Sequence, residues 1–147
     1  MAPRDMPDAV RIVVLDTNVL VSGLLSPLGP PAQILALTIA GELTAAHDPR
    51  VLSEYRDVLR RPEFGFAKHR VREVLDQLER DGLPVVPRPL RGRLPDPSDE
   101  PFLEVAAAAG AVVVTGNLRH FPPTRREGVL VLSPRELLDR LRAAPRE

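Results

Sequence analysis

Acidic residues at three separate places in the chain have the type and position expected of a metal-binding site. Asp16 directly follows residues 12–15, an uncharged run rich in β-branched side chains that predicts a strand buried on both faces. Glu54 lies at the border of the apolar stripe of a predicted helix, and Asp99, with Asp96 close by, lies at the start of another. Carboxylates brought together repel one another and stay ionised only where a cation compensates them.

The chemistry of these side chains restricts the cation. Carboxylate oxygens without histidine or cysteine among the ligands select Mg²⁺ or Mn²⁺, and the chain has no cysteine at all. Such ions generate hydroxide from bound water and stabilise phosphoryl charge; where two are present they lie ~4 Å apart. A site of this kind typically hydrolyses phosphodiesters.

Each acid also has a purely structural interpretation. Glu54 could be a solvated residue on a helix face beside neighbouring arginines, and Asp96 and Asp99 could both be helix N-caps. Asp16 is harder to explain in this way, because a charge directly after a buried strand needs a partner. The functional interpretation therefore depends on the acids lying together.

Strand and helix signals alternate along the chain. Strands are expected at residues 12–15, 43–46, 83–86, 111–115 and 129–132. Helices are expected at residues 32–40, 49–60, 68–81, 101–109 and from 134 onward, with a Ser/Gly/Pro connection at residues 22–31. The alternation predicts an α/β fold, a three-layer α/β/α arrangement with a mostly parallel central sheet. Residues 16–18 and 115–117 then follow two buried strands at their carboxyl ends, where open sheets place ligands.

Length and composition limit the class of protein. The 147 residues predict a single domain at residues 11–142 after a flexible tail at residues 1–10. The formal net charge is zero, so no global field attracts nucleic acid. The longest apolar run, residues 105–114, is too short to span a bilayer, and residues 1–10 contain no apolar segment typical of a secretory signal. We therefore expect no membrane partner and a cytoplasmic location.

Three stretches of the sequence together resemble a known family. Residues 15–22, LDTNVLVS, are similar to the opening motif of PIN-domain nucleases, and residues 53–59, SEYRDVL, to their second acidic helix. Residues 96–106, DPSDEPFLEVA, followed by AVVVTGN at 111–117, are similar to the third acid and the strand before the fourth position. The order and spacing hold over residues 12–138, and the closest likeness is to the VapC-like toxins of bacterial toxin–antitoxin pairs.

The resemblance implies a Mg²⁺- or Mn²⁺-dependent ribonuclease that acts on RNA, often forms a homodimer and is inhibited by a cognate antitoxin. By position, it assigns the catalytic, metal-binding acids to Asp16, Glu54 and Asp99. It assigns supporting hydrogen bonds to Asn18 and Thr115.

One position departs from the family pattern. The fourth acid is commonly aspartate, and here it is Asn117. An asparagine carbonyl can still coordinate a metal, but it brings one negative charge fewer, so metal affinity should fall. Asp96 could restore that charge as a further ligand. The alternative is a catalytically weakened or inactive PIN module that acts through RNA or protein binding.

Basic residues after the fourth position are candidates for RNA phosphate contacts. They are Arg119, His120, Arg125 and Arg126, with a second, weaker patch at Arg88, Arg91 and Arg93. A solvated arginine loop is the alternative. Two other classes fit poorly: a haloacid-dehalogenase-type phosphatase needs a second aspartate where Asn18 stands, and a response-regulator receiver needs a late lysine, whereas the only lysine is Lys68.

Overall fold

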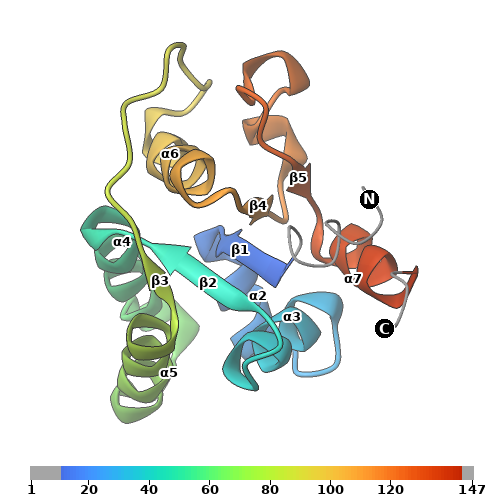
Figure 1. The fold of residues 1–147 in the computed structure, drawn as a ribbon. Helices are drawn as coiled ribbons and strands as arrows, with labels where there is room; N and C mark the ends of the chain where they lie inside the picture. The colour runs from blue at the N-terminus through green and yellow to red at the C-terminus, as the bar shows by residue number, and fades with distance from the viewer. Residues whose placement is uncertain (1–10, 144–147) are drawn as a thin grey trace.

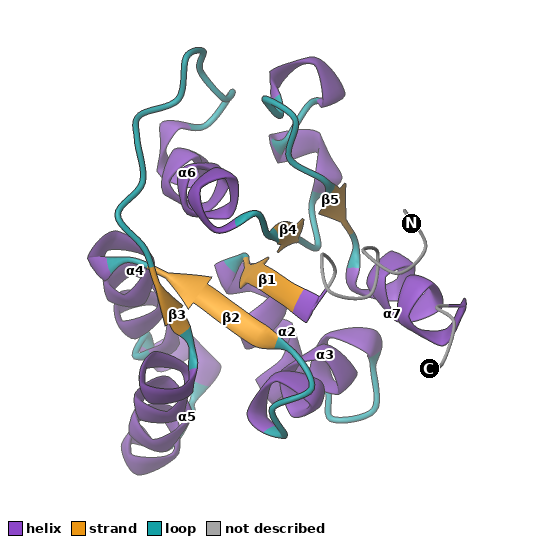
Figure 2. Cartoon of the chain, in the orientation of Figure 1, coloured by secondary structure: helices purple, strands orange, loops and turns teal. Residues whose placement is uncertain are grey.

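The central sheet is parallel throughout. The structure, a computed structural model, describes residues 11–143, so the expected tail at residues 1–10 lies outside the described residues. The strands are β1 (Ile12–Leu15), β2 (Thr44–His47), β3 (Leu83–Pro84), β4 (Val112–Val114) and β5 (Val131–Leu132). They are arranged in the order β3-β2-β1-β4-β5, with every neighbouring pair parallel (Figures 1 and 2).

Helices cover both faces of this sheet. They are α2 (Thr17–Leu25), α3 (Pro30–Ile39), α4 (Pro49–Leu59), α5 (Lys68–Asp81), α6 (Glu100–Ala109) and α7 (Pro134–Ala143). Short 3-10 helices are η1 (Pro62–Phe64), η2 (Pro97–Asp99), η3 (Leu118–His120) and η4 (Pro123–Arg125). In Figure 1, α6 lies on one side of the sheet and α3 and α5 lie on the other. The predicted three-layer α/β/α class is therefore confirmed.

Local sequence explains where several helices begin and end. Asp48 caps α4, since its carboxylate accepts a hydrogen bond of 3.0 Å from the backbone N–H of Val51. Ser133 and Glu136 form a reciprocal capping box at the start of α7. Gly110 ends α6 with a φ of 66°, a left-handed conformation that favours glycine.

The expected connection at residues 22–31 is wrong in its first part, because α2 extends to Leu25. Gly23 lies inside this helix and is buried. A Cβ built at Gly23 would lie 3.2 Å from the carbonyl oxygen of Pro31, so the missing side chain lets α3 approach α2 closely. The glycine therefore serves packing rather than a turn.

The register of the sheet positions the site. Leu15 in β1 pairs with Val114 in β4, so the residues that follow, Asp16 and Thr115, leave the sheet side by side. β2 and β4 lie on opposite sides of β1 in the sheet, so the strand order reverses at β1. No single helix within residues 11–143 is long and apolar enough to cross a membrane, although α2 and α3 together reach the necessary length and composition across a bend of 102°.

Candidate active site

Asp16 is buried at the carboxyl end of β1, with 5% of its surface exposed. It stands at the N-cap position of α2 but makes no capping bond with its side chain. Instead its Oδ2 accepts hydrogen bonds from Thr115 Oγ1 at 2.8 Å and from Asn18 Nδ2 at 3.2 Å. Burial raises the pKa of Asp16, and the bond from Thr115 opposes that rise.

Asn18 and Thr115 make further hydrogen bonds near the strand ends. Asn18 Oδ1 accepts a hydrogen bond of 2.9 Å from the backbone N–H of Gly116, and Thr115 Oγ1 accepts one of 3.0 Å from that of Asn117. A Cβ at Gly116 would lie 3.2 Å from Asn18 Oδ1. Glycine at this position therefore allows Asn18 to contact the chain that follows β4, and the supporting role of Asn18 at a metal site stays a prediction.

Asp99 lies at the junction of η2 and α6. It is 7% exposed and makes no capping bond at the start of α6. Burial and the negative charge of Asp16 raise its pKa to about 6, and His120 opposes the rise. His120 Nδ1 lies 3.0 Å from Asp99 Oδ2, although that oxygen has no hydrogen-bond partner among the described residues. Asp16 and Asp99 therefore act on each other electrostatically, as carboxylates sharing one site do.

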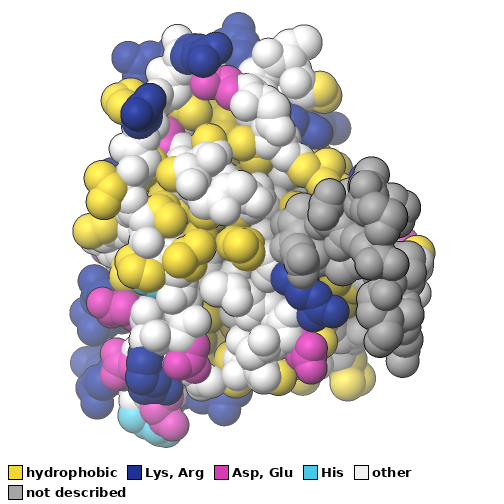
Figure 3. Space-filling view, in the orientation of Figure 1, with side chains coloured by type: hydrophobic (Ala, Val, Ile, Leu, Met, Phe, Trp, Pro, Cys, Tyr) yellow, Lys and Arg dark blue, Asp and Glu magenta, His cyan; other side chains and the backbone are white. Residues whose placement is uncertain are grey.

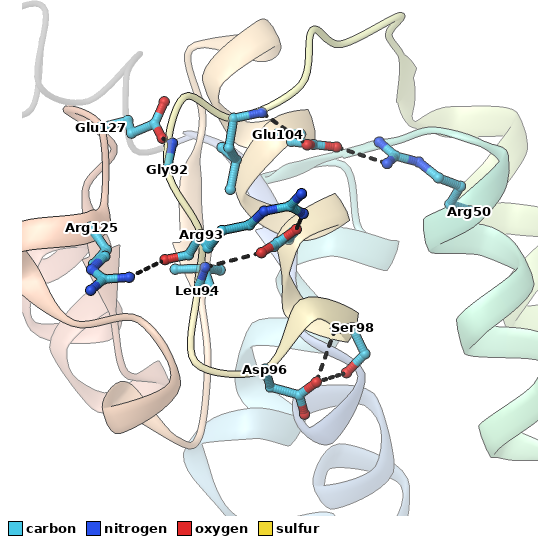
Figure 4. Close-up of polar contacts among 11 residues, drawn as sticks. Arg50, Gly92, Arg93, Leu94, Asp96, Ser98, Glu104, Arg125 and Glu127 are labelled. Atoms are coloured by element: carbon cyan, nitrogen blue, oxygen red, sulfur yellow. Dashed lines mark hydrogen bonds and ion pairs between the residues drawn. The ribbon is translucent and has the colours of Figure 1, made fainter.

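Asp96 is exposed and caps η2. Its Oδ1 accepts hydrogen bonds from the backbone N–H of Ser98 at 2.9 Å and from Ser98 Oγ at 2.8 Å (Figure 4). These bonds lower the pKa of Asp96. The N-cap interpretation thus describes Asp96 but not Asp99, and the role of Asp96 as a metal ligand stays a prediction.

Glu54 lies on α4, half-buried, on the side facing the other acids. Partial burial raises its pKa; the charge of Arg61 lowers it, and the charges of Asp57 and Asp16 raise it further. Glu54 forms no ion pair with any described residue. Arg61 pairs with Asp57 at 3.7 Å. The other neighbour, Arg50, binds the buried Asp48 and Glu104, so neither arginine pairs with Glu54.

His120 contacts two of the predicted site residues. Asn117 Nδ2 lies 2.9 Å from His120 Nε2, on the other side of the ring from Asp99. With Nε2 accepting from the amide, the neutral ring carries its proton on Nδ1, the nitrogen that lies 3.0 Å from Asp99 Oδ2. The sequence alone carried no signal for this contact, since Asp99 and His120 are 21 positions apart on separate elements.

The other predicted substrate residues differ in how they are held. Arg119 is exposed and makes no side-chain hydrogen bond or ion pair with residues 11–143. Arg125 Nη1 donates to the backbone oxygen of Arg93 at 2.8 Å, and Arg126 Nε donates to that of Phe121 at 2.8 Å. Arg125 and Arg126 therefore stabilise loops, and contact with RNA phosphate by any of these residues stays a prediction.

The acids do not form a complete set of metal ligands. Within residues 11–143, no three Asp, Glu or His side chains lie close enough to hold one ion together. The donors nevertheless fit Mg²⁺ or Mn²⁺. Asp16 and Asp99 are buried carboxylates whose pKa values are raised by burial, and the charge of Asp16 raises that of Asp99 further. A divalent cation between them would oppose these rises and would use the oxygen ligands it prefers.

This fold and this arrangement of acids define the class of protein. A family model described as a PIN domain matches residues 12–119. The chain therefore belongs to the PIN-domain family.

Among solved structures, the chain is similar to one described as the crystal structure of VapBC2 from Rickettsia felis bound to a DNA fragment from their promoter. The sequences are 20% identical, the TM-score is 0.57, and the alignment covers 83% of this chain and 98% of the other. No curated protein matches the chain. At this identity the structural likeness supports the fold.

Proposed function

We propose that this PIN-domain protein is a Mg²⁺- or Mn²⁺-dependent endoribonuclease. The observation that carries the proposal is the pair of buried carboxylates, Asp16 and Asp99, near the point where the strand order reverses, with the charge of Asp16 raising the pKa of Asp99. Two charges are rarely buried together without a compensating partner. A catalytic cation is the partner that best accounts for them in this family.

The chain's own residues would hold that cation and prepare the site. Asp16 and Asp99 would be its main ligands, with Glu54, Asp96 and the amide oxygen of Asn117 available around them. When bound, the cation would activate water and stabilise charge on the scissile phosphate. Thr115 and Asn18 would keep the Asp16 carboxylate ionised and oriented through their hydrogen bonds to Oδ2.

RNA is the proposed substrate, and the exposed end of η3 is the proposed point of contact. Arg119 has no described partner, so its guanidinium is available to a phosphate. Arg125 and Arg126 keep further N–H donors beyond those that bind loop carbonyls. His120 would contact phosphate only after leaving Asp99, and we assign it first to the acids.

We further propose that the protein is the toxin of a toxin–antitoxin pair. The VapC-like motifs and the likeness to the VapBC2 structure support this assignment. The same proposal includes three further features. They are a cognate antitoxin that covers the acid site, assembly as a homodimer, and a cytoplasmic location. Copurification of the chain with the product of a neighbouring reading frame would test the first of these.

The direct test of the enzyme is cleavage of a mixed pool of single-stranded and structured RNA. The wild type is compared with Asp16→Asn in Mg²⁺, in Mn²⁺ and in EDTA. We expect metal-dependent cleavage that Asp16→Asn abolishes without unfolding the protein. Asp76→Asn, an exposed carboxylate on α5, is the matched control and should cleave normally.

The alternative, a weakened or inactive PIN module, makes a different prediction. It gives no cleavage in any metal, while RNA or a protein partner still binds. Full activity in Asp16→Asn would instead show that the assigned acids are not the catalytic site.

A further inference from the structure

Two segments far apart in the sequence are joined above the acid site. The first is the loop at residues 88–94, between β3 and η2; the second is the segment at residues 119–127, after Asn117. Glu127 Oε2 accepts a hydrogen bond of 2.9 Å from the backbone N–H of Gly92 (Figure 4). Its Oε1 accepts one of 3.1 Å from the backbone N–H of Arg91. Arg125 donates in the other direction, to the backbone oxygen of Arg93.

Carboxylates from α6 fix the same loop from its inner side. Glu104 accepts from the backbone N–H of Leu90 at 3.0 Å, and Glu100 accepts from that of Leu94 at 3.0 Å. Consecutive parts of the loop are therefore bound by three acidic side chains, although a surface loop would ordinarily satisfy its N–H groups with water. The loop is held in one shape, and its arginine side chains project from a fixed backbone.

The backbone of Glu127, whose side chain binds this loop, has an uncommon conformation. It has a φ of 50°, the only positive φ among the non-glycine residues of the described chain. A left-handed conformation is unfavourable for such a residue and persists where surrounding contacts enforce it. Glu127 and Gly128 form a tight turn that a backbone hydrogen bond of 2.9 Å from the Val129 N–H to the Arg126 oxygen closes. The turn presents the Glu127 carboxylate to the loop, and the two bonds to the loop backbone lower its pKa.

The surface formed in this way is strongly basic in a protein of zero net charge. We name it the basic rim and define it by its exposed arginines, which are Arg88, Arg91, Arg93, Arg119 and Arg125. Residues 82–95 contain no aspartate or glutamate, and Glu127 is the one acid in the segment at residues 119–127. The nearby acids Glu100, Glu104 and Glu127 accept hydrogen bonds from backbone N–H groups, and Glu100 also pairs with Arg93 at 3.4 Å. Arg88, Arg91 and Arg119 have no ion-pair partner among residues 11–143. Figure 3 shows Lys and Arg side chains gathered at the end of the molecule where the two segments lie.

The rim is continuous with the candidate active site. The loop at residues 88–94 leads directly into Asp96 and Asp99, and the other segment begins beside Asn117 and includes His120. Arginine presents planar, bidentate donors that match phosphate oxygens, and a line of such groups follows a nucleic-acid backbone. An acidic peptide would have no reason to extend from the rim toward a cluster of carboxylates.

We propose that the basic rim binds the phosphate backbone of single-stranded RNA outside the reacting nucleotides, with Arg88 and Arg91 as contacts beyond the acid site. This inference rests on the proposed nuclease function and extends it to a second part of the substrate. The rim would retain the RNA while one of its phosphates lies between Asp16 and Asp99.

The test measures RNA binding separately from cleavage. All proteins carry Asp16→Asn so that the RNA stays intact, and binding of a fluorescein-labelled, mixed-sequence single-stranded RNA is followed by anisotropy. The rim variant is Arg88→Ala/Arg91→Ala. Its matched control is Arg70→Ala/Arg72→Ala on α5, which removes the same charge from exposed arginines at the other end of the view in Figure 1.

We expect the rim variant to bind RNA about tenfold more weakly and to reduce the salt dependence of log K by about 1 to 1.5, with the control unchanged. Three results would each contradict the proposal for the basic rim. They are an equal loss of RNA affinity in the two double variants, no loss of RNA affinity in either, and competition by poly-glutamate as effective as that by unlabelled RNA.

The wild type's cleavage of RNA separates this proposal from the one it rests on. If the wild type cleaves RNA and the rim variant binds RNA normally, only the proposal for the basic rim is wrong. If the wild type does not cleave RNA and the Asp16→Asn protein does not bind it, both the proposed function and the proposal for the basic rim are wrong.

Discussion

The hydroxyl of Tyr55 donates a hydrogen bond of 2.6 Å to the carbonyl oxygen of Leu15, the last residue of β1. Tyr55 is the neighbour of Glu54 on α4, and Leu15 is the neighbour of Asp16. One buried bond therefore sets the distance between two of the predicted metal ligands. Burial raises the pKa of Tyr55 far above its ordinary range, so the hydroxyl stays a donor.

Tyr55→Phe should reduce both stability and activity. The substitution keeps the ring, which packs against Phe102, but leaves the buried carbonyl of Leu15 without its donor. We expect a loss of about 1–2 kcal/mol in the free energy of unfolding, measured in urea. Because α4 is no longer fixed to the strand end, we expect a further loss of RNA cleavage and of metal affinity.

A matched variant separates these two effects. Thr38→Val removes another buried hydroxyl, which donates to Ile34 at 2.8 Å within α3 and lies outside the acid site. It should lower stability less than Tyr55→Phe, because the Ile34 carbonyl keeps its helical hydrogen bond from the backbone N–H of Thr38, and cleavage by the folded protein should stay normal. Equal losses of cleavage in Tyr55→Phe and Thr38→Val would show that Tyr55 contributes only to stability.

Patterns within one element predicted much of this fold. The uncharged run before Asp16 predicted β1, and the stripe of apolar residues from Lys68 to Asp81 predicted α5 with its observed bounds. α2 was missed because Ser22 and Gly23 indicate a connection when read locally. The reason for that glycine is its contact with Pro31, which only the packed structure contains.

The candidate site was predictable in its residue types but not in its contacts. Asp96 and Asp99 have similar surroundings in the sequence, each near a proline at the start of a helical turn. Only the structure distinguishes the exposed cap at Asp96 from the buried carboxylate at Asp99. The contacts of Tyr55 with Leu15 and of His120 with Asp99 join separate elements, so no local pattern could indicate them.

The raised pKa of Asp99 makes a prediction about stability. In the folded protein its pKa is about 6, whereas the ordinary value of 3.8 applies to the unfolded chain. Between these values the folded state binds the additional proton, so the free energy of unfolding in EDTA should rise as the pH falls through about 6. A shift of this size in a partly solvated group contributes about 1–2 kcal/mol.

Urea denaturation in EDTA at a series of pH values from 5 to 8 measures this effect. Asp99→Asn should lose most of the pH dependence and should be more stable than the wild type at the highest pH. Saturating Mg²⁺ should stabilise the wild type at that pH and have little effect on the variant. The same pH dependence in both proteins would contradict the assignment of the raised pKa to Asp99.

Thr115→Val should move the pH dependence of cleavage. The hydroxyl bond to Asp16 Oδ2 opposes the rise in the pKa of Asp16, and valine has a similar shape without that donor. The acidic midpoint of kcat/KM should therefore shift to higher pH. Thr115→Ser restores the hydroxyl and should restore the midpoint. If the valine variant loses activity at every pH without a shift, Thr115 serves the packing of β4 rather than the ionisation of Asp16.

Asn117→Asp tests the position where this chain departs from the family pattern. The amide lies beside His120, on the side of the ring away from Asp99, and its replacement adds a carboxylate oxygen and one negative charge to the site. We expect Mn²⁺ affinity measured by calorimetry to rise by about tenfold, since a further charged oxygen ligand favours a divalent cation. Asn117→Ala, which offers no oxygen, should bind Mn²⁺ no better than the wild type. Unchanged affinity in Asn117→Asp would place this residue outside the metal's ligands, and its contact with His120 would then be its main role.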